Sequence, residues 1–144
     1  MATERYAEVS WQGSLMEGSG TIERVGTGAF GPLDVSWPAR AEEPGEQTSP
    51  EELIAAAHAA CFSMAFSGEL ARGGNAPERL DTRADVTFEP GTGITRIALA
   101  VRGRVPGLDE SGFRQAAESA KTGCPVSQAL AGVPEITLEA TLES

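Results

Sequence analysis

One uninterrupted alanine-rich segment, residues 50–71, constrains the fold of this chain more than any other feature. Ser49 is a favourable N-cap, Pro50 suits the first helical position, and Glu52 stands three residues after the cap as in a capping box. Apolar residues then recur at steps of three and four until a Gly-Gly pair ends the pattern. Because the alanines allow close packing on more than one side, the segment predicts a long, central, buried helix.

Strands are predicted on both sides of this helix. Before it, short apolar segments separated by glycines and turn residues predict a meander. After it, apolar and polar residues alternate, as is typical of half-buried strands. The predicted strands cover residues 7–12, 20–25, 33–38, 80–88, 97–103 and 136–142, and two further helices cover 109–122 and 125–131. This order predicts a single α+β domain over residues 1–144, with mainly antiparallel strands.

Length and charge limit the classes of function. A chain of 144 residues, 40% of them hydrophobic, fits one domain with one packed core. The net charge of -10 would repel a phosphate backbone and an anionic membrane surface, so we expect no nucleic acid and no membrane as partner. The N-terminus lacks the pattern of a secretion signal, and no apolar run approaches the roughly 20 residues of a membrane span. We therefore expect a cytoplasmic protein.

Two cysteines, Cys61 and Cys124, offer the reactive chemistry of this chain. Together with a single histidine, they are too few for a dense disulfide framework or a four-ligand Cys/His zinc site. In the cytosol a thiol pair is more often catalytic or redox-sensing than structural. The sequence therefore indicates thiol chemistry and no zinc site of this kind.

The two cysteines differ in their predicted surroundings. Cys61 lies inside the long helix, where a free cysteine is often only a small buried apolar residue. A cation would have to lie near it to lower the pKa of its thiol. Cys124 stands between a helix-breaking glycine and Pro125, which predicts a helix N-terminus whose backbone N–H groups favour a thiolate. On these grounds alone, either cysteine could still be structural.

Three further residues have both an ordinary and a chemical interpretation. His58 stands three residues before Cys61 and could activate its thiol, but it could also be a hydrogen-bonded core or interface histidine. Arg40 fits a solvated loop, and Glu51 fits a charge that stabilises the helix N-terminus. The local pattern leaves these alternatives open.

Two long motifs resemble those of the OsmC/Ohr family of peroxidases. The first, TSPEELIAAAHAACFSMA over residues 48–65, is similar to the segment with the family's peroxide-attacking cysteine. The second, AKTGCPVSQ over residues 120–128, is similar to its resolving-cysteine motif. Residues 10–13 and 105–109 also resemble the OsmC branch, so the resemblance covers nearly the whole chain.

The resemblance implies roles for four residues. Cys61 would attack an organic hydroperoxide, and Cys124 would then resolve the sulfenic acid as a disulfide. Arg40 would stabilise the Cys61 thiolate and polarise the peroxide bond, and Glu51 would hold that arginine in place. The Ohr branch carries a tyrosine where His58 stands, so the resemblance does not imply an essential imidazole base.

The resemblance also implies partners. An external dithiol, either a lipoylated protein or a thioredoxin-like donor, would reduce the disulfide. The family fold implies an intertwined homodimer with composite active sites. The long helix agrees, because Glu51 and Cys61 lie ten residues apart, or about 15 Å along its axis. We therefore expect Arg40 and Glu51 of one chain to meet Cys61 and Cys124 of the other.

The substrate and the activity leave room for alternatives. Phe62, Met64 and Phe66 predict an apolar entrance beside Cys61, and hence better use of bulky organic hydroperoxides than of hydrogen peroxide. A non-catalytic thiol sensor or a module that binds hydrophobic ligands would fit the same fold. A structural protein with inert thiols is the third alternative.

Overall fold

Two three-stranded sheets and one long helix make up most of the chain. The computed structural model describes residues 1–143 and divides into two units, Met1–Leu53 and a second unit from Ile54 onward. Each unit contains one of the sheets, and helix α2 (Pro50–Arg72) begins in the first unit and continues in the second. The predicted α+β class is confirmed, and the single domain predicted over residues 1–144 stays a prediction.

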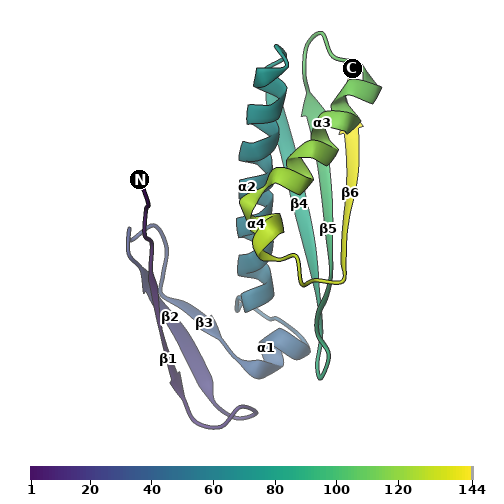
Figure 1. Ribbon diagram of the computed structural model, residues 1–144. Helices are drawn as coiled ribbons and strands as arrows, with labels where there is room; N and C mark the ends of the chain where they lie inside the picture. The colour runs from purple at the N-terminus through teal and green to yellow at the C-terminus, as the bar shows by residue number, and fades with distance from the viewer. Residues whose placement is uncertain (144) are drawn as a thin grey trace. The chain divides into compact units, whose positions relative to one another are not determined.

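The first unit contains an antiparallel meander. Strands β1 (Ala7–Gln12), β2 (Ser19–Val25) and β3 (Leu33–Val35) pair in sequence order (Figure 1). All six residues of β1 are exposed, and β2 buries only Gly20 and Ile22. This sheet therefore leaves most of its side chains in contact with solvent.

The predicted third strand extended into residues that form a helix. Strand β3 ends at Val35, and a short helix, α1 (Trp37–Ala41), follows. The cause is a local cap, because the Ser36 hydroxyl accepts a hydrogen bond from the backbone N–H of Ala39 at 3.3 Å. Arg40 thus lies on a helix and not in the predicted loop.

Helix α2 begins as predicted. The Ser49 hydroxyl accepts a hydrogen bond from the backbone N–H of Glu52 at 3.1 Å, which makes Ser49 the N-cap. The capping box is not completed, because the Glu52 carboxylate accepts a hydrogen bond from the Thr48 hydroxyl at 2.8 Å. The helix then continues without interruption to Arg72, one residue beyond its predicted end.

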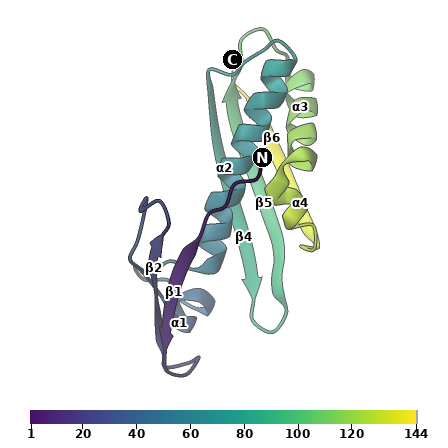
Figure 2. The ribbon, with the colours of Figure 1, turned by 60° about the vertical axis from the view of Figure 1, so that its left-hand side comes forward.

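The second unit packs helices on one face of a sheet (Figures 1 and 2). The strands are β4 (Arg79–Glu89), β5 (Gly93–Arg104) and β6 (Glu135–Leu142), with β5 in the middle. Strands β5 and β6 are parallel, because helices α3 (Glu110–Gly123) and α4 (Pro125–Ala129) form a crossover between them. The prediction of mainly antiparallel strands is confirmed, since the other three pairings are antiparallel.

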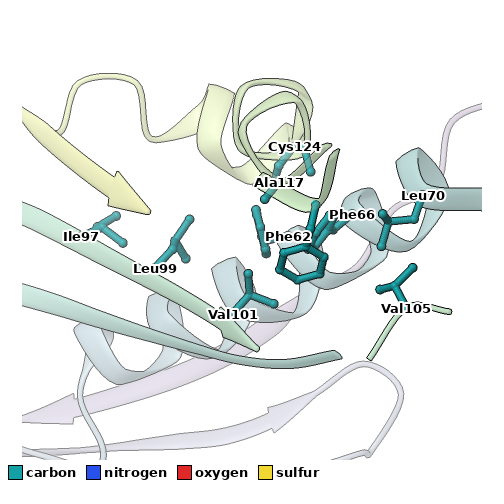
Figure 3. Close-up of a cluster of buried hydrophobic side chains, with 11 residues drawn as sticks. Phe62, Phe66, Leu70, Ile97, Leu99, Val101, Val105, Ala117 and Cys124 are labelled. Carbon is teal, nitrogen blue, oxygen red and sulfur yellow. The ribbon is translucent and has the colours of Figure 1, made fainter. Parts of the chain in front are cut away.

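Aromatic rings fill the space between α2, α3 and the sheet (Figure 3). The ring centroid of Phe66 lies 5.5 Å from that of Phe62 and 5.0 Å from that of Phe113, and all three side chains are fully buried. Gly103 of β5 leaves room for this cluster, since a Cβ there would meet Phe113 at 2.6 Å. Cys124 belongs to the same cluster, so core packing determines the position of one cysteine.

Helix α2 also has the length and composition of a membrane span, and within residues 1–143 no other helix does. Its most apolar 18-residue window has a mean hydropathy of 1.3, because alanines link several short apolar runs. A mostly buried core helix of a soluble protein meets the same criterion, but only 22% of this window is buried. Helix α2 does bury Phe62, Phe66 and Leu70 in the second unit, so the predicted burial of the helix is only partial. The hydropathy of α2 is therefore only weak evidence for a membrane partner.

Candidate active site

The structure brings the two predicted cysteines together. The sulfur of Cys124 lies 3.1 Å from that of Cys61, and both thiols are free. Cys61 projects from the middle of α2 and is half-buried, whereas Cys124 is fully buried at the junction of α3 and α4. A short movement would bring the sulfurs to the roughly 2 Å of a disulfide bond. The residues therefore form a dithiol with one partly exposed member.

Local backbone structure places Cys124 at a helix start, as predicted. It is the N-cap of α4, and Pro125 follows in the first helical position. Its backbone N–H donates a hydrogen bond to the Ala120 carbonyl at 2.8 Å, which closes the last turn of α3. Gly123 is the final residue of α3 and does not interrupt it earlier. The two helices thus meet at the cysteine itself.

The groups that stabilise a thiolate gather around Cys124. Burial alone would raise the pKa of this thiol, but contacts with Cys61, with the Ser127 amide and hydroxyl and with the Val126 amide lower it overall. Burial raises the pKa of Cys61, and the contact with Cys124 raises it further, against a smaller effect of the Val126 amide. The two thiols lie 3.1 Å apart and therefore titrate as a coupled pair.

A second pair of predicted site residues meets in the first unit. The Arg40 guanidinium donates hydrogen bonds to both carboxylate oxygens of Glu51, from Nη2 at 2.8 Å and from Nε at 3.0 Å and 3.2 Å. The side chain of Glu51 is only 8% exposed, and that of Arg40 is 31% exposed. Such a bidentate ion pair holds the plane of the guanidinium in one orientation. The predicted contact is thus present, and the catalytic role of both residues stays a prediction.

Ser127 was not predicted as a site residue, and the sequence left the role of His58 open. His58 is fully buried, and its Nε2 lies 2.7 Å from the Ser127 hydroxyl. Burial lowers the pKa of His58, which favours the neutral imidazole. The signal for Ser127 was its spacing, since the third residue after an N-cap faces the cap side chain. His58 is therefore hydrogen-bonded to α4, the helix whose N-cap is Cys124.

The predicted apolar entrance beside Cys61 is only partly present. Phe62 and Phe66 are fully buried in the core of the second unit, so assigning them to an entrance was wrong. Met64 is 74% exposed, and its spacing of three residues from Cys61 places both on neighbouring parts of the helix surface. Met64 is thus the one residue of the predicted set that can flank an approach to the thiol.

Comparison with known proteins connects these features to a family. The OsmC-like protein family matches residues 43–139. The chain is 43% identical to Peroxiredoxin OsmC of Escherichia coli (strain K12) over the full length of both proteins. It is 31% identical to an organic hydroperoxide resistance protein of Xanthomonas axonopodis pv. citri (strain 306), over 65% of this chain and 67% of that one.

A solved structure agrees with the observed fold. The crystal structure of an organic hydroperoxide resistance protein OsmC from Legionella pneumophila is similar with a TM-score of 0.64 and 22% identity. The match covers 96% of this chain and 97% of that one. By the family match, the full-length sequence relative and the shared fold, this chain belongs to the OsmC-like protein family.

Proposed function

We propose that this chain is a cytoplasmic, thiol-dependent peroxidase that reduces organic hydroperoxides, and hydrogen peroxide less well, without a bound cofactor. The observation that carries the proposal is the contact of two free thiols 3.1 Å apart, one of them partly exposed. The relatives named peroxiredoxin and organic hydroperoxide resistance protein support it. The activity is assigned to the thiol pair and not to any other part of the chain.

The reaction divides into two sulfur-centred steps. The Cys61 thiolate attacks one peroxide oxygen; an S–O bond forms, the O–O bond breaks, and the alkoxide leaves and takes up a proton as the alcohol. The Cys124 thiolate then attacks the sulfur of the Cys61 sulfenic acid. An S–S bond forms, the S–O bond breaks, and hydroxide leaves and is protonated to water. An external dithiol, for which a lipoylated protein is our first candidate, reduces the disulfide.

The first step needs a cation near Cys61. The groups that act on this thiol in the second unit raise its pKa overall, so they do not produce the thiolate that must attack. Arg40, with its orientation held by the buried Glu51, is the group we assign to this task. It would also stabilise the negative charge that develops on the leaving oxygen.

We assign this cation to the second chain of a homodimer. Glu51 and Cys61 are ten positions apart on α2, about 15 Å along the helix, which is a long reach for one clamped arginine. The first unit also exposes large apolar side chains of the kind that interfaces cover. These side chains are Tyr6, Val9, Trp11, Leu15, Met16 and Phe30.

A turnover assay tests the proposed activity. The purified protein should consume many equivalents of cumene hydroperoxide with a dithiol such as dihydrolipoamide, with a higher kcat/KM than for hydrogen peroxide. Cys61→Ser should abolish turnover, because a hydroxyl at this position is a far weaker nucleophile than a thiolate. Ser63→Ala, which removes a half-buried hydroxyl from the same helix, is the matched control and should retain activity. Turnover by Cys61→Ser near the wild-type rate would overturn the proposal.

One observation favours a second candidate, a non-catalytic thiol sensor. The raised pKa of Cys61 within one chain fits a thiol that reacts slowly. A sensor would consume about one equivalent of peroxide and stop even with dithiol present, because its oxidised form is the signal. Multiple turnovers in the same assay exclude this alternative.

A further inference from the structure

The peroxidase cycle proposed above gives no role to a fully buried histidine of the second unit and its half-buried serine partner. His58 is fully buried on α2, three residues before Cys61, and its Nε2 lies 2.7 Å from the hydroxyl of Ser127 on α4. Its Nδ1 is buried without a hydrogen-bond partner among residues 1–143. A buried polar side chain that satisfies one nitrogen and not the other is costly, so its retention calls for an explanation.

The position of Ser127 connects this pair to the thiols. Cys124 is the N-cap of α4, and Ser127 is the third residue of that helix, so its amide and side chain face the cap residue. The Cys124 side chain accepts no hydrogen bond from the α4 backbone, but the polar groups of Ser127 lower the pKa of its thiol. His58 is hydrogen-bonded to Ser127, and Ser127 lies in the first turn of α4 after Cys124, whose sulfur is 3.1 Å from that of Cys61.

The direction of the hydrogen bonds follows from counting protons. The Ser127 hydroxyl has one proton, which it can donate either to His58 or to the Cys124 thiolate. If His58 carries its proton on Nε2 and donates it to the hydroxyl, the proton of Ser127 is free for the sulfur. The neutral imidazole that burial favours can do this, and its bare Nδ1 is then the nitrogen without a partner.

We propose that His58 and Ser127 are positioning residues for Cys124: His58 fixes the Ser127 hydroxyl as a donor, and Ser127 directs its proton at the sulfur that resolves the sulfenic acid. The pair thereby favours the Cys124 thiolate and aims it at Cys61. The disulfide forms as written above, with hydroxide as leaving group, and needs no oxidant beyond the peroxide. The role assigned to this pair is a step of the proposed peroxidase cycle and so rests on that proposal. The titration of the Cys124 thiol can nevertheless be measured without peroxide.

The surroundings of Cys124 keep this test simple. Helix α4 has no titratable side chain, and α2 and α3 together carry Glu51, Glu52, His58, Cys61, Glu69, Arg72, Glu110, Arg114, Glu118 and Lys121. Of these, Cys61 contacts the Cys124 sulfur, and His58 is hydrogen-bonded to Ser127 on α4. The Lys121 amine donates a hydrogen bond to the Ile136 carbonyl at 3.3 Å and is thereby engaged away from the sulfur. In a Cys61→Ser background only one thiol remains in the chain, so its titration reports on Cys124 alone.

The experiment measures the ultraviolet absorbance of the thiolate against pH in Cys61→Ser protein. Adding Ser127→Ala should raise the midpoint by about one pH unit, the size expected for one lost hydrogen bond to a charged group. His58→Leu should raise it in the same direction by less, and His58→Gln, which keeps a donor, should restore it. The matched control Ser63→Ala removes a hydroxyl that bonds the Ala59 carbonyl and should leave the midpoint unchanged.

Each outcome decides the inference. If Ser127→Ala shifts the midpoint no more than Ser63→Ala does, Ser127 does not act on the thiolate, and the proposal is wrong. If Ser127→Ala shifts it but His58→Leu and His58→Gln behave alike, the role of His58 is wrong. Should the His58 variants fail to fold, Ser127→Thr, which keeps the hydroxyl, must restore the wild-type midpoint, or the proposal is again wrong.

A second measurement separates this inference from the proposed function. In protein with both cysteines, one equivalent of cumene hydroperoxide is added and the disulfide is followed by quenched mass spectrometry. Below the thiolate midpoint, Ser127→Ala should slow disulfide formation up to about tenfold, while oxidation of Cys61 keeps its rate. If no variant reacts with peroxide but the titration shifts as expected, the proposed function fails and the effect of Ser127 on the thiol stands.

Discussion

The environment of Cys124 combines two opposing effects on one sulfur. Full burial disfavours a charged thiolate, while the polar groups at the start of α4 and the neighbouring thiol favour it. A buried thiolate is protected from direct oxidation by peroxide in solution, yet it lies beside the one partner that it must attack. This environment suits a resolving residue better than a first nucleophile.

With Cys61 as the nucleophile and Cys124 as the resolving residue, the proposal predicts how Cys124→Ser behaves. The variant should consume about one equivalent of hydroperoxide and then stop, because the Cys61 sulfenic acid has no second thiol in the chain to condense with. Mass spectrometry of the treated protein should find one or two added oxygens on Cys61. Cys61→Ser, treated in the same way, should remain unmodified at residue 61. Sustained turnover of Cys124→Ser with a dithiol would show that Cys124 does not resolve.

The sequence predicted individual site residues unevenly. Cys61, Cys124 and Glu51 could be named because two motifs resemble those of a family, and Arg40 because its position before the first motif matches the OsmC branch. The structure pairs the four residues two by two. For Ser127 the sequence held only its spacing from Cys124 as a signal, and that spacing does not reveal the contact with His58. Hydrogen bonds between side chains far apart in sequence depend on packing that no local pattern encodes.

Helix α2 carries one residue of each proposed pair, so the proposed site depends on an intact N-terminus of this helix. Glu51 lies in its first turn and holds Arg40, while Cys61 lies in its middle. The first turn in turn depends on the cap, because backbone N–H groups there have no partner within the helix. A weaker cap should therefore lower the free energy of unfolding more readily than it changes the reactivity of the thiols.

Ser49→Ala tests this dependence. Loss of the 3.1 Å hydrogen bond to the backbone N–H of Glu52 should lower the free energy of unfolding by about 1 kcal/mol. Urea denaturation measures the change as a lower midpoint at constant m-value. The control is Ser67→Ala in the interior of the same helix, where the change should stay within about 0.5 kcal/mol. Equal effects of the two substitutions would show that Ser49 does not cap α2 in solution.

The predicted bounds of several elements were wrong, since α4 ends at Ala129 and not near 131, β5 begins at Gly93, and the third strand is cut short by an adjacent helix. Residues 36–38 look extended by composition, but the serine cap and proline start α1 there. The parallel pairing of β5 and β6 could not be assigned from the sequence, because alternation identifies a strand without giving its direction. Two helices between strands were themselves a signal for a crossover, and hence for parallel pairing. The local sequence therefore predicted that a helix or strand exists more reliably than it predicted where the element ends or in which direction it runs.

The first unit leaves an unusually large part of its sheet without cover. Every residue of β1 is exposed, including the large side chains of Val9 and Trp11. The same unit holds Arg40 and Glu51, the cationic part of the proposed site. A second copy of the chain that covers this sheet would bring the Arg40–Glu51 pair along with it. Dimer formation and completion of the site would then be one event.

The composite site predicts complementation between two inactive variants. Glu51→Ala lacks the residue that holds Arg40, and Cys61→Ser lacks the nucleophile, so each alone should be inactive. In a mixed dimer, one site receives Glu51 from one chain and Cys61 from the other and is intact. After subunit exchange in an equal mixture, peroxidase activity should reach about a quarter of the wild-type value, since about half of the dimers are mixed and each has one working site.

The control for this experiment separates shared sites from failed exchange. Native mass spectrometry should first show that mixed dimers have formed, and each variant carried alone through the same exchange procedure should stay inactive. If both partners of the site came from one chain, every site in the mixture would still lack either Glu51 or Cys61. Absence of activity in proven mixed dimers would therefore assign the Arg40–Glu51 pair to the same chain as the cysteine on which it acts. The Arg40 guanidinium would then have to reach Cys61 along α2 within one chain.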